Sequence, residues 1–328
     1  MTLAVQRDLD ELRAGLERWL GRSVGDISRP DPGYSCETLI VERDLVVRLP
    51  PVGDAIFPTY VLAQQTAAQT ALAAAGVPVA DPARYEPDSS YLGTPFVTMP
   101  FVAGPIPGEF TPIDPWLTGL PSDEDRGTAW SAFLETLAAI HRAPLEGLGL
   151  RTGLDAELAY WSEYLDWSCD GAPPAALRDA LEWCAANRPA DEPAPGLLWG
   201  DVRLGNVVFD DEARRPRAVL DWDMVSAGPA EMDLAWFLAL EQVQVDMTDM
   251  RVPGFGTRDE AIALLEAGIG RPLQDLPWHE VFALVRASAV ATRIAVLFRQ
   301  AGQRSMFKVG QDPTLAEATK RIEAWSPR

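Results

Sequence analysis

The sequence contains few cysteines, histidines and lysines. Three cysteines and two histidines occur among 328 residues, and none of them has the spacing of a metal site. We therefore expect neither a disulfide scaffold nor a zinc site. Lysine occurs only at Lys308 and Lys320, near the C-terminal end. Every other basic role must fall to arginine.

Positive charge is scarce as well. The chain has 28 lysines and arginines against 48 aspartates and glutamates, which gives a formal net charge of −20 and a pI near 4.5. The negative electrostatic field of such a chain repels a polyanion unless the basic residues are clustered, and the sequence has no basic run. We expect no nucleic-acid partner. Most of the acidic excess is typical of a solvated surface, although it also suits a cationic substrate.

Long uninterrupted apolar runs are missing too. The longest candidate, residues 281–298, is interrupted by Arg286 and Arg293, whereas a membrane helix needs roughly 18 or more apolar residues. The first 21 residues are acidic and amphipathic, unlike a signal peptide. These features predict a cytoplasmic protein with no membrane partner; they leave the oligomeric state open.

The composition is that of a globular protein with a substantial core, at 47% hydrophobic and 23% charged residues. Strand-like runs at residues 38–41 and 45–49 flank a polar turn, and a second pair is expected at 83–85 and 96–100. Helical spacing of apolar residues predicts helices at 3–20, 55–75, 128–141, 155–169, 174–187, 231–242, 257–268 and 278–301. The predicted fold class is α+β.

Proline and glycine are frequent over residues 103–123, which predicts a hinge and loop region. The chain therefore divides into a small β-rich N-terminal lobe, residues 1–102, and a larger, mainly helical C-terminal lobe, residues 103–328. The C-terminal lobe should contain one inserted β-hairpin.

That hairpin is the most informative passage. Two apolar strands, residues 207–209 and 218–220, flank a charged turn. A hairpin brings its outer ends together, so Asp201, Asn206 and Asp221 should converge at one mouth. Taken singly, each of these residues is also typical of a loop.

The interval from Asp201 to Asn206 matches a kinase catalytic loop, in which the aspartate accepts the proton of the attacking hydroxyl and the asparagine binds Mg²⁺. Asp221 is then placed like the aspartate that bridges Mg²⁺ to the nucleotide phosphates. Hard oxygen ligands are needed because Mg²⁺ must neutralise the phosphate charge. Arg203 is a candidate contact for the transferred phosphoryl group, since an arginine fork suits phosphate.

The chain resembles aminoglycoside-phosphotransferase-type kinases, in the branch related to kinase-like domains fused to some acyl-CoA dehydrogenases. The resemblance rests on Trp199-Gly200-Asp201 with Asn206, on Leu220-Asp221-Trp222-Asp223-Met224, and on Asp233-Leu234-Ala235-Trp236. It implies a bilobal, protein-kinase-like fold. It also implies transfer of the γ-phosphoryl group of ATP, with GTP as the alternative donor, to a hydroxyl group, with Mg²⁺ as cofactor.

The resemblance implies further roles. Gly33 to Thr38, with Ser35, resembles the turn that covers the nucleotide, and the Pro100 carbonyl and Val102 amide would pair with the purine edge. Asp233 would hydrogen-bond the catalytic-loop backbone. Asp223 is either a second metal ligand or a solvated or structural acid. His141 is expected to be structural rather than a catalytic base.

The sequence departs from the family pattern at three positions. Trp199 replaces the usual histidine, and Arg48 must replace the strand lysine that grips the phosphates. The helix glutamate that pairs with this cation is missing, and Gln65 or Gln64 stands near its place. An Arg48–Gln65 contact would orient the cation less firmly than an ion pair.

The missing glutamate keeps a second interpretation open, in which the protein is a pseudokinase that binds a nucleotide or metabolite. For a kinase, the acceptor is a small hydroxyl-bearing molecule of either of two kinds. An aminoglycoside would need acidic residues at the cleft, with candidates at Asp155, Glu157, Glu163, Asp166, Asp170, Glu241 and Asp246. A hydroxyacyl-CoA would need arginines there, with candidates at Arg258, Arg286, Arg293 and Arg299.

Overall fold

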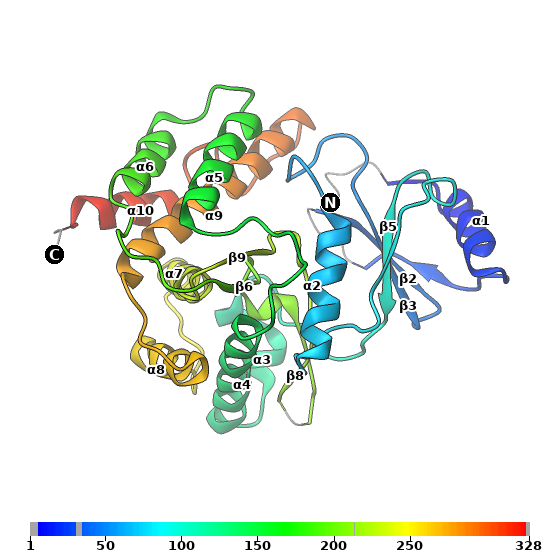
Figure 1. Cartoon of the computed structure of the whole chain (residues 1–328), viewed down its shortest axis with the longest axis horizontal. Coiled ribbons are helices and arrows are strands. Elements are labelled where there is room, and N and C mark those ends of the chain that lie inside the picture. Colours follow the sequence, from blue (N-terminus) through cyan, green and yellow to red (C-terminus); the bar gives the residue numbers. More distant parts are fainter. Residues whose placement is uncertain (1–5, 31–34, 213, 326–328) are drawn as a thin grey trace.

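The structure is a computed structural model that describes residues 6–30, 35–212 and 214–325. It has a small lobe built on an antiparallel sheet and a larger, mainly helical lobe, with helix α2 lying between the sheet and the large lobe (Figure 1). The predicted bilobal α+β fold is confirmed.

The small lobe has a five-stranded sheet in the order β1-β2-β3-β5-β4. Its elements are α1 (Leu9–Leu20), β1 (Ile27–Ser28), β2 (Glu37–Val41), β3 (Leu45–Leu49), α2 (Leu62–Ala74), β4 (Arg84–Glu86) and β5 (Phe96–Pro100). Between β2 and β3, Glu42 and Arg43 both adopt φ of 54°, as a tight hairpin turn requires. The predicted turn is therefore confirmed.

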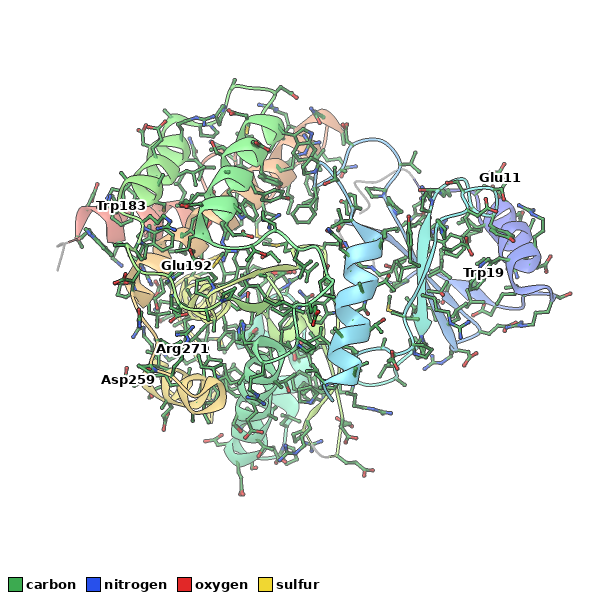
Figure 2. All side chains as sticks on the ribbon, viewed as in Figure 1. Glu11, Trp19, Trp183, Glu192, Asp259 and Arg271 are labelled. Carbon is green, nitrogen blue, oxygen red and sulfur yellow. The ribbon has the colours of Figure 1, made fainter. Side chains whose placement is uncertain are left out.

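Helices cover both faces of this sheet. Helix α1 begins after Asp8, whose side chain accepts hydrogen bonds from the first-turn amides, and buries Leu12 and Leu16 against β2 and β3. Trp19 of α1 (Figure 2) packs edge-on against Phe96, with ring centroids 5.4 Å apart, and its indole N–H donates to Glu86 at 3.0 Å. Helix α2 takes the other face and shares its buried Ala68 and Leu72 with the core of the large lobe. It thereby couples the two lobes.

The large lobe packs around one long helix, α9, which contacts α5, α6, α7 and α10. Its helices are η1 (Thr111–Ile113), α3 (Pro115–Gly119), α4 (Asp123–His141), α5 (Leu154–Ser168), α6 (Ala175–Ala186), η2 (Leu204–Asn206), α7 (Glu231–Thr248), α8 (Arg258–Ile269), α9 (Leu276–Gln300) and α10 (Pro313–Glu323). Its strands are β6 (Gly196–Leu198), β7 (Val207–Phe209), β8 (Pro216–Val219) and β9 (Ser226–Gly228). Two short antiparallel pairs, β7–β8 and β6–β9, carry the loops of the site.

Several predicted boundaries need correction. The first helix begins at Leu9 rather than at residue 3, and α2 begins at Leu62 rather than at residue 55. The region 103–123 is not only loop, because η1 and α3 form there. The sequence pattern also missed α10, whose N-terminus is capped by Asp312 and has Pro313 in its first turn. The hairpin strand β8 ends at Val219, one residue earlier than expected.

Within the described part of the chain, one helix is long and apolar enough to cross a membrane, namely α9. Most of its length is buried inside the protein, where its apolar faces form the core of the large lobe.

Candidate active site

The hairpin β7–β8 brings the predicted catalytic residues together. Val207 pairs with Val219, and the Leu220 amide donates to the Asn206 carbonyl at 2.8 Å. This pairing closes the mouth at which Asp201, Asn206 and Asp221 meet. The convergence predicted from the sequence is what the structure shows.

Asp201 is held by three side-chain donors. Its Oδ2 accepts from Asn206 Nδ2 at 2.8 Å and from Arg203 Nε at 3.0 Å, and its Oδ1 accepts from Trp236 Nε1 at 3.1 Å. Burial raises the pKa of this carboxyl above its ordinary value, while Arg203 acts in the opposite direction. An oriented carboxylate of raised pKa is suited to accept a proton from a hydroxyl group.

Helix α7 anchors the loop that carries Asp201. The buried Asp233 carboxylate accepts from the amides of Trp199 at 2.8 Å and Gly200 at 3.0 Å. Burial raises its pKa to about 7, against the lowering effect of these two hydrogen bonds. His141, the last residue of α4, lies 3.7 Å from Asp233, and burial lowers the pKa of its imidazole to about 4. Asp233 thus hydrogen-bonds the loop backbone as predicted, and His141 packs next to Asp233.

Trp199 fastens the catalytic loop to the loop that carries Asp221. Its indole N–H donates to the carbonyl oxygens of Leu220 at 2.9 Å and Asp221 at 3.2 Å, and its ring is buried against Trp222. Trp199 therefore fixes the backbone that carries Asp201 relative to the backbone that carries Asp221.

The donor set fits Mg²⁺. Asn206 uses its Nδ2 on Asp201, which leaves its Oδ1 as a ligand, and the Asp221 carboxylate is 31% exposed. No group of three or more His, Cys, Asp or Glu side chains in the described residues forms a metal cluster by itself. Mg²⁺ usually takes only one or two carboxylates and completes its shell with phosphates and water. Asn206 and Asp221 are sufficient as the protein's share of such a site.

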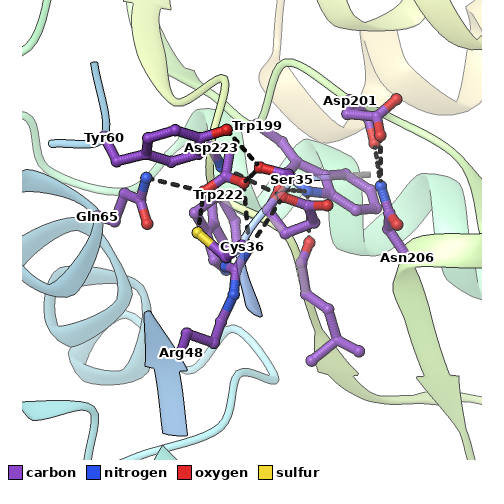
Figure 3. Close-up of polar contacts among 12 residues, drawn as sticks. Ser35, Cys36, Arg48, Tyr60, Gln65, Trp199, Asp201, Asn206, Trp222 and Asp223 are labelled. Carbon is purple, nitrogen blue, oxygen red and sulfur yellow. Dashed lines mark hydrogen bonds and ion pairs between the residues drawn. The ribbon is translucent and has the colours of Figure 1, made fainter. Parts of the chain in front are cut away.

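The Asp223 carboxylate belongs to a cluster with residues of the small lobe (Figure 3), and the Asp223 amide donates to Asp221 Oδ1 at 3.4 Å. Its Oδ2 accepts from Arg48 Nη2 at 3.1 Å and from the Ser35 hydroxyl, and its Oδ1 accepts from Gln65 Nε2 at 2.9 Å. The expected Arg48–Gln65 contact is therefore replaced by a shared carboxylate. Arg48 also lies 3.5 Å from Asp221 Oδ1. Gly33 and Tyr34, the first two residues of the predicted nucleotide-covering turn, lie outside the described residues.

Two adjoining pockets open on these residues. The smaller one, of 380 Å³, is lined by the hinge residues Pro100 and Val102 together with Asn206. The larger one, of 510 Å³, is lined by Asp201 and by apolar side chains of α7 and α9. Ser35, Arg48, Arg203 and Asp221 line both pockets. The predicted nucleotide-binding residues thus gather at the smaller pocket, and the predicted base faces the larger.

Of the residues predicted to recognise the acceptor, only Glu241 lines the larger pocket in the described structure. Arg286 is buried over Trp236, with its guanidinium 5.0 Å from the ring centre, and Arg293 is buried against Trp167. Arg258 pairs with Glu280 at 3.0 Å, away from the cleft. The proposed arginine set therefore does not form the pocket wall.

Sequence reasoning missed two contacts of the catalytic loop. Trp236 donates to Asp201, and its position one helical turn after Asp233 was a usable signal, because residues three apart share a helix face. Glu109 pairs with Arg203 at 2.6 Å. No local pattern indicated Glu109, since 94 residues separate the two.

Comparison with known proteins identifies the family of the chain. Residues 26–263 match the model of the phosphotransferase enzyme family. Human acyl-CoA dehydrogenase family member 11 is 32% identical over 198 residues, which is 58% of this chain and 24% of that protein. The chain therefore spans about a quarter of the length of this curated relative.

Two solved structures share the fold. A Ralstonia eutropha protein assigned to the aminoglycoside phosphotransferases has a TM-score of 0.66 and 20% identity, with 97% of this chain and 96% of that chain covered. The GDP and kanamycin complex of an aminoglycoside phosphotransferase has a TM-score of 0.57 and 15% identity, with 97% and 98% covered.

A bilobal fold with an Asp–Asn hairpin at the junction of the lobes is the arrangement of a phosphotransferase-type fold. The chain belongs to the phosphotransferase enzyme family whose model it matches.

Proposed function

We propose that the protein transfers the γ-phosphoryl group of Mg²⁺·ATP, or of Mg²⁺·GTP, to a hydroxyl group of a small molecule bound in the larger pocket. The observation that carries this proposal is the arrangement of the two pockets. Asn206 and the hinge line the smaller pocket, Asp201 lines the larger, and Arg48, Arg203 and Asp221 stand at their junction. This is where a phosphoryl group would pass from donor to acceptor.

We assign a separate role to each residue of the site. Asp201 accepts the hydroxyl proton, and its rotation is restricted by the hydrogen bonds from Asn206, Arg203 and Trp236. Bound Mg²⁺ would neutralise phosphate charge, and Asn206 and Asp221 would hold it. Arg48 binds the phosphates on the donor side. Phosphoryl transfer depends mainly on positioning and charge stabilisation, so these contacts should govern the rate.

We propose a mainly apolar acceptor, of which the acyl part of a hydroxyacyl thioester is the candidate class. The side chains of α9 that line the larger pocket are Ala287, Val290, Ala291, Ile294 and Phe298. Three of the pocket's four acids, Glu109, Asp201 and Asp221, already lie next to an arginine. A polycationic aminoglycoside needs several free carboxylates, and Glu241 alone remains. The similarity to acyl-CoA dehydrogenase family proteins supports the same choice.

The first test is calorimetric titration of ATP and GTP into the protein with and without Mg²⁺, with the Asp221→Ala variant as control. Mg²⁺-dependent binding that weakens in the variant supports the kinase site. An ADP-release assay with hydroxyacyl thioesters and with aminoglycosides then identifies the acceptor class. Nucleotide binding without turnover on any acceptor would favour the pseudokinase interpretation. We further propose a cytoplasmic location, which the three free cysteines support.

A further inference from the structure

Asp223 is the most completely engaged acid of the site. Its side chain is 3% exposed, and both carboxylate oxygens have partners. Oδ1 accepts from Gln65 and lies 3.9 Å from the Cys36 thiol, while Oδ2 accepts from Ser35 and Arg48. Magnesium demands an almost ideal octahedral shell of oxygens. A carboxylate already surrounded by four protein donors is a poor ligand for it.

The partners of Asp223 all belong to the other lobe. Ser35 precedes β2, Arg48 lies on β3 and Gln65 lies on α2, whereas Asp223 follows the hairpin of the large lobe. The pairs are separated by 188, 175 and 158 residues along the chain. Figure 3 shows these side chains pointing toward the same carboxylate. Asp223 therefore ties three elements of the nucleotide-binding lobe to the catalytic lobe.

Arg48 needs such a partner. Helix α2, with the sequence LAQQTAAQTALAA, contains no acidic residue that could pair with it. Within the described residues, the carboxylates within 4 Å of its guanidinium belong to Asp221 and Asp223. Asp221 is the more exposed and the more distant of the two, at 3.5 Å, and is required for the metal. Asp223 is left as the permanent counter-charge.

We propose that Asp223 is a positioning residue, not a second metal ligand. Its carboxylate supplies from the large lobe the negative charge that α2 lacks, and thereby holds Arg48 toward the nucleotide phosphates. This role rests on the proposed kinase function. It also accounts for the buried glutamine at position 65, whose amide completes the shell of the carboxylate.

The test exchanges the amide and the acid. Asp223→Asn removes the counter-charge, and we expect the KM for the nucleotide to rise about tenfold with a smaller change in kcat, because Arg48 holds the phosphates in ground and transition states alike. The Mg²⁺ concentration for half-maximal activity should stay unchanged. The double variant Gln65→Glu with Asp223→Asn keeps volume, hydrogen bond and net charge, and moves the acid onto α2. We expect it to recover most of the nucleotide KM.

A matched control adds the same charge one residue away. Gln64 also lies on α2, but its amide donates to the Gly149 carbonyl, away from Asp223. Gln64→Glu with Asp223→Asn should therefore not restore the KM. Rescue by this control, failure of the Gln65 exchange to rescue, or an Asp223→Asn variant whose Mg²⁺ requirement rises would each overturn the positioning role.

The contact between Gln65 and Asp223 can also be tested without nucleotide. Urea unfolding of the single and double variants at positions 65 and 223 gives their coupling in the free protein, and we expect the two changes to be far from additive. Additive effects would contradict the contact itself. Coupling together with wild-type protein that binds no Mg²⁺·nucleotide would overturn the proposed function while leaving the tie between the lobes established.

Discussion

At the scale of single residues, Asp201 is oriented by three side-chain donors, Asn206, Arg203 and Trp236. We predict that Asp201→Asn lowers kcat by about 10²–10⁴-fold, the usual contribution of a general base. Nucleotide affinity should change little, because Asp201 lines the larger pocket and not the smaller one. ADP release measures the first effect and calorimetry the second. Retained turnover would remove Asp201 from the mechanism.

Glu241 should make stability depend on pH. Burial raises the pKa of its carboxyl to about 7, and Arg251 acts in the opposite direction. The folded protein thus binds this proton more tightly than the unfolded chain, whose glutamate has an ordinary pKa near 4.5. The resulting stabilisation is fully present below pH 4.5 and is lost as pH rises through 7.

Glu241→Gln removes this dependence because an amide stays neutral. We predict that, between pH 4.5 and 8, the free energy of unfolding of the variant rises relative to that of the wild type by roughly 1–3 kcal/mol. Urea unfolding of both proteins across this range measures the difference, and the other titrating groups cancel in the comparison. A constant difference across the range would show that Glu241 keeps an ordinary pKa.

At the scale of elements, the loop between β6 and η2 depends on Gly200. Its φ is +92°, and a β-carbon there would lie 2.6 Å from the Met224 carbonyl oxygen. We predict that Gly200→Ala destabilises the fold by at least about 2 kcal/mol, through backbone strain and overlap together. Activity should fall with it, since Gly200 precedes Asp201.

Gly147 is the matched control for this substitution. Its φ is +77°, but a β-carbon there would meet no atom within 4 Å. Gly147→Ala should therefore cost only the strain of the left-handed backbone, about 1–2 kcal/mol. Urea unfolding midpoints of the two variants compare these costs. Equal losses would contradict the close approach of Gly200 to the Asp221–Met224 loop.

At the scale of the whole molecule, both lobes contribute residues to the proposed nucleotide site. Arg48 and Pro100 come from the small lobe, and Asn206 and Asp221 come from the large one. A ligand that contacts both should stabilise them together, by about 2.7 kcal/mol at one hundred times its Kd. We predict a rise in Tm of a few degrees with Mg²⁺·ATP. Thermal unfolding with and without Mg²⁺ tests this; an equal rise without Mg²⁺ would contradict the assigned metal ligands.

Much of the architecture was predictable because its signals are local. The β2–β3 turn, the β4–β5 pair and most helices followed from residue spacing within short windows. Helix α10 could have been found from Asp312 and Pro313, a cap followed by a first-turn proline. The two-residue strand β1 and the β6–β9 pair had no such pattern, since strands this short depend on partners far along the chain.

The sequence by itself determined the hairpin that brings Asp201, Asn206 and Asp221 together, because Asp201 and Asn206 are five residues apart and the strands between Asn206 and Asp221 pair locally. Only the tertiary structure decided which acids and arginines face the cleft, and which carboxylate pairs with Arg48. Those contacts join segments 158 to 188 residues apart. In the sequence Asp223 looks like any loop aspartate, and its role arises only when the packing of the two lobes buries it among donors from the other lobe.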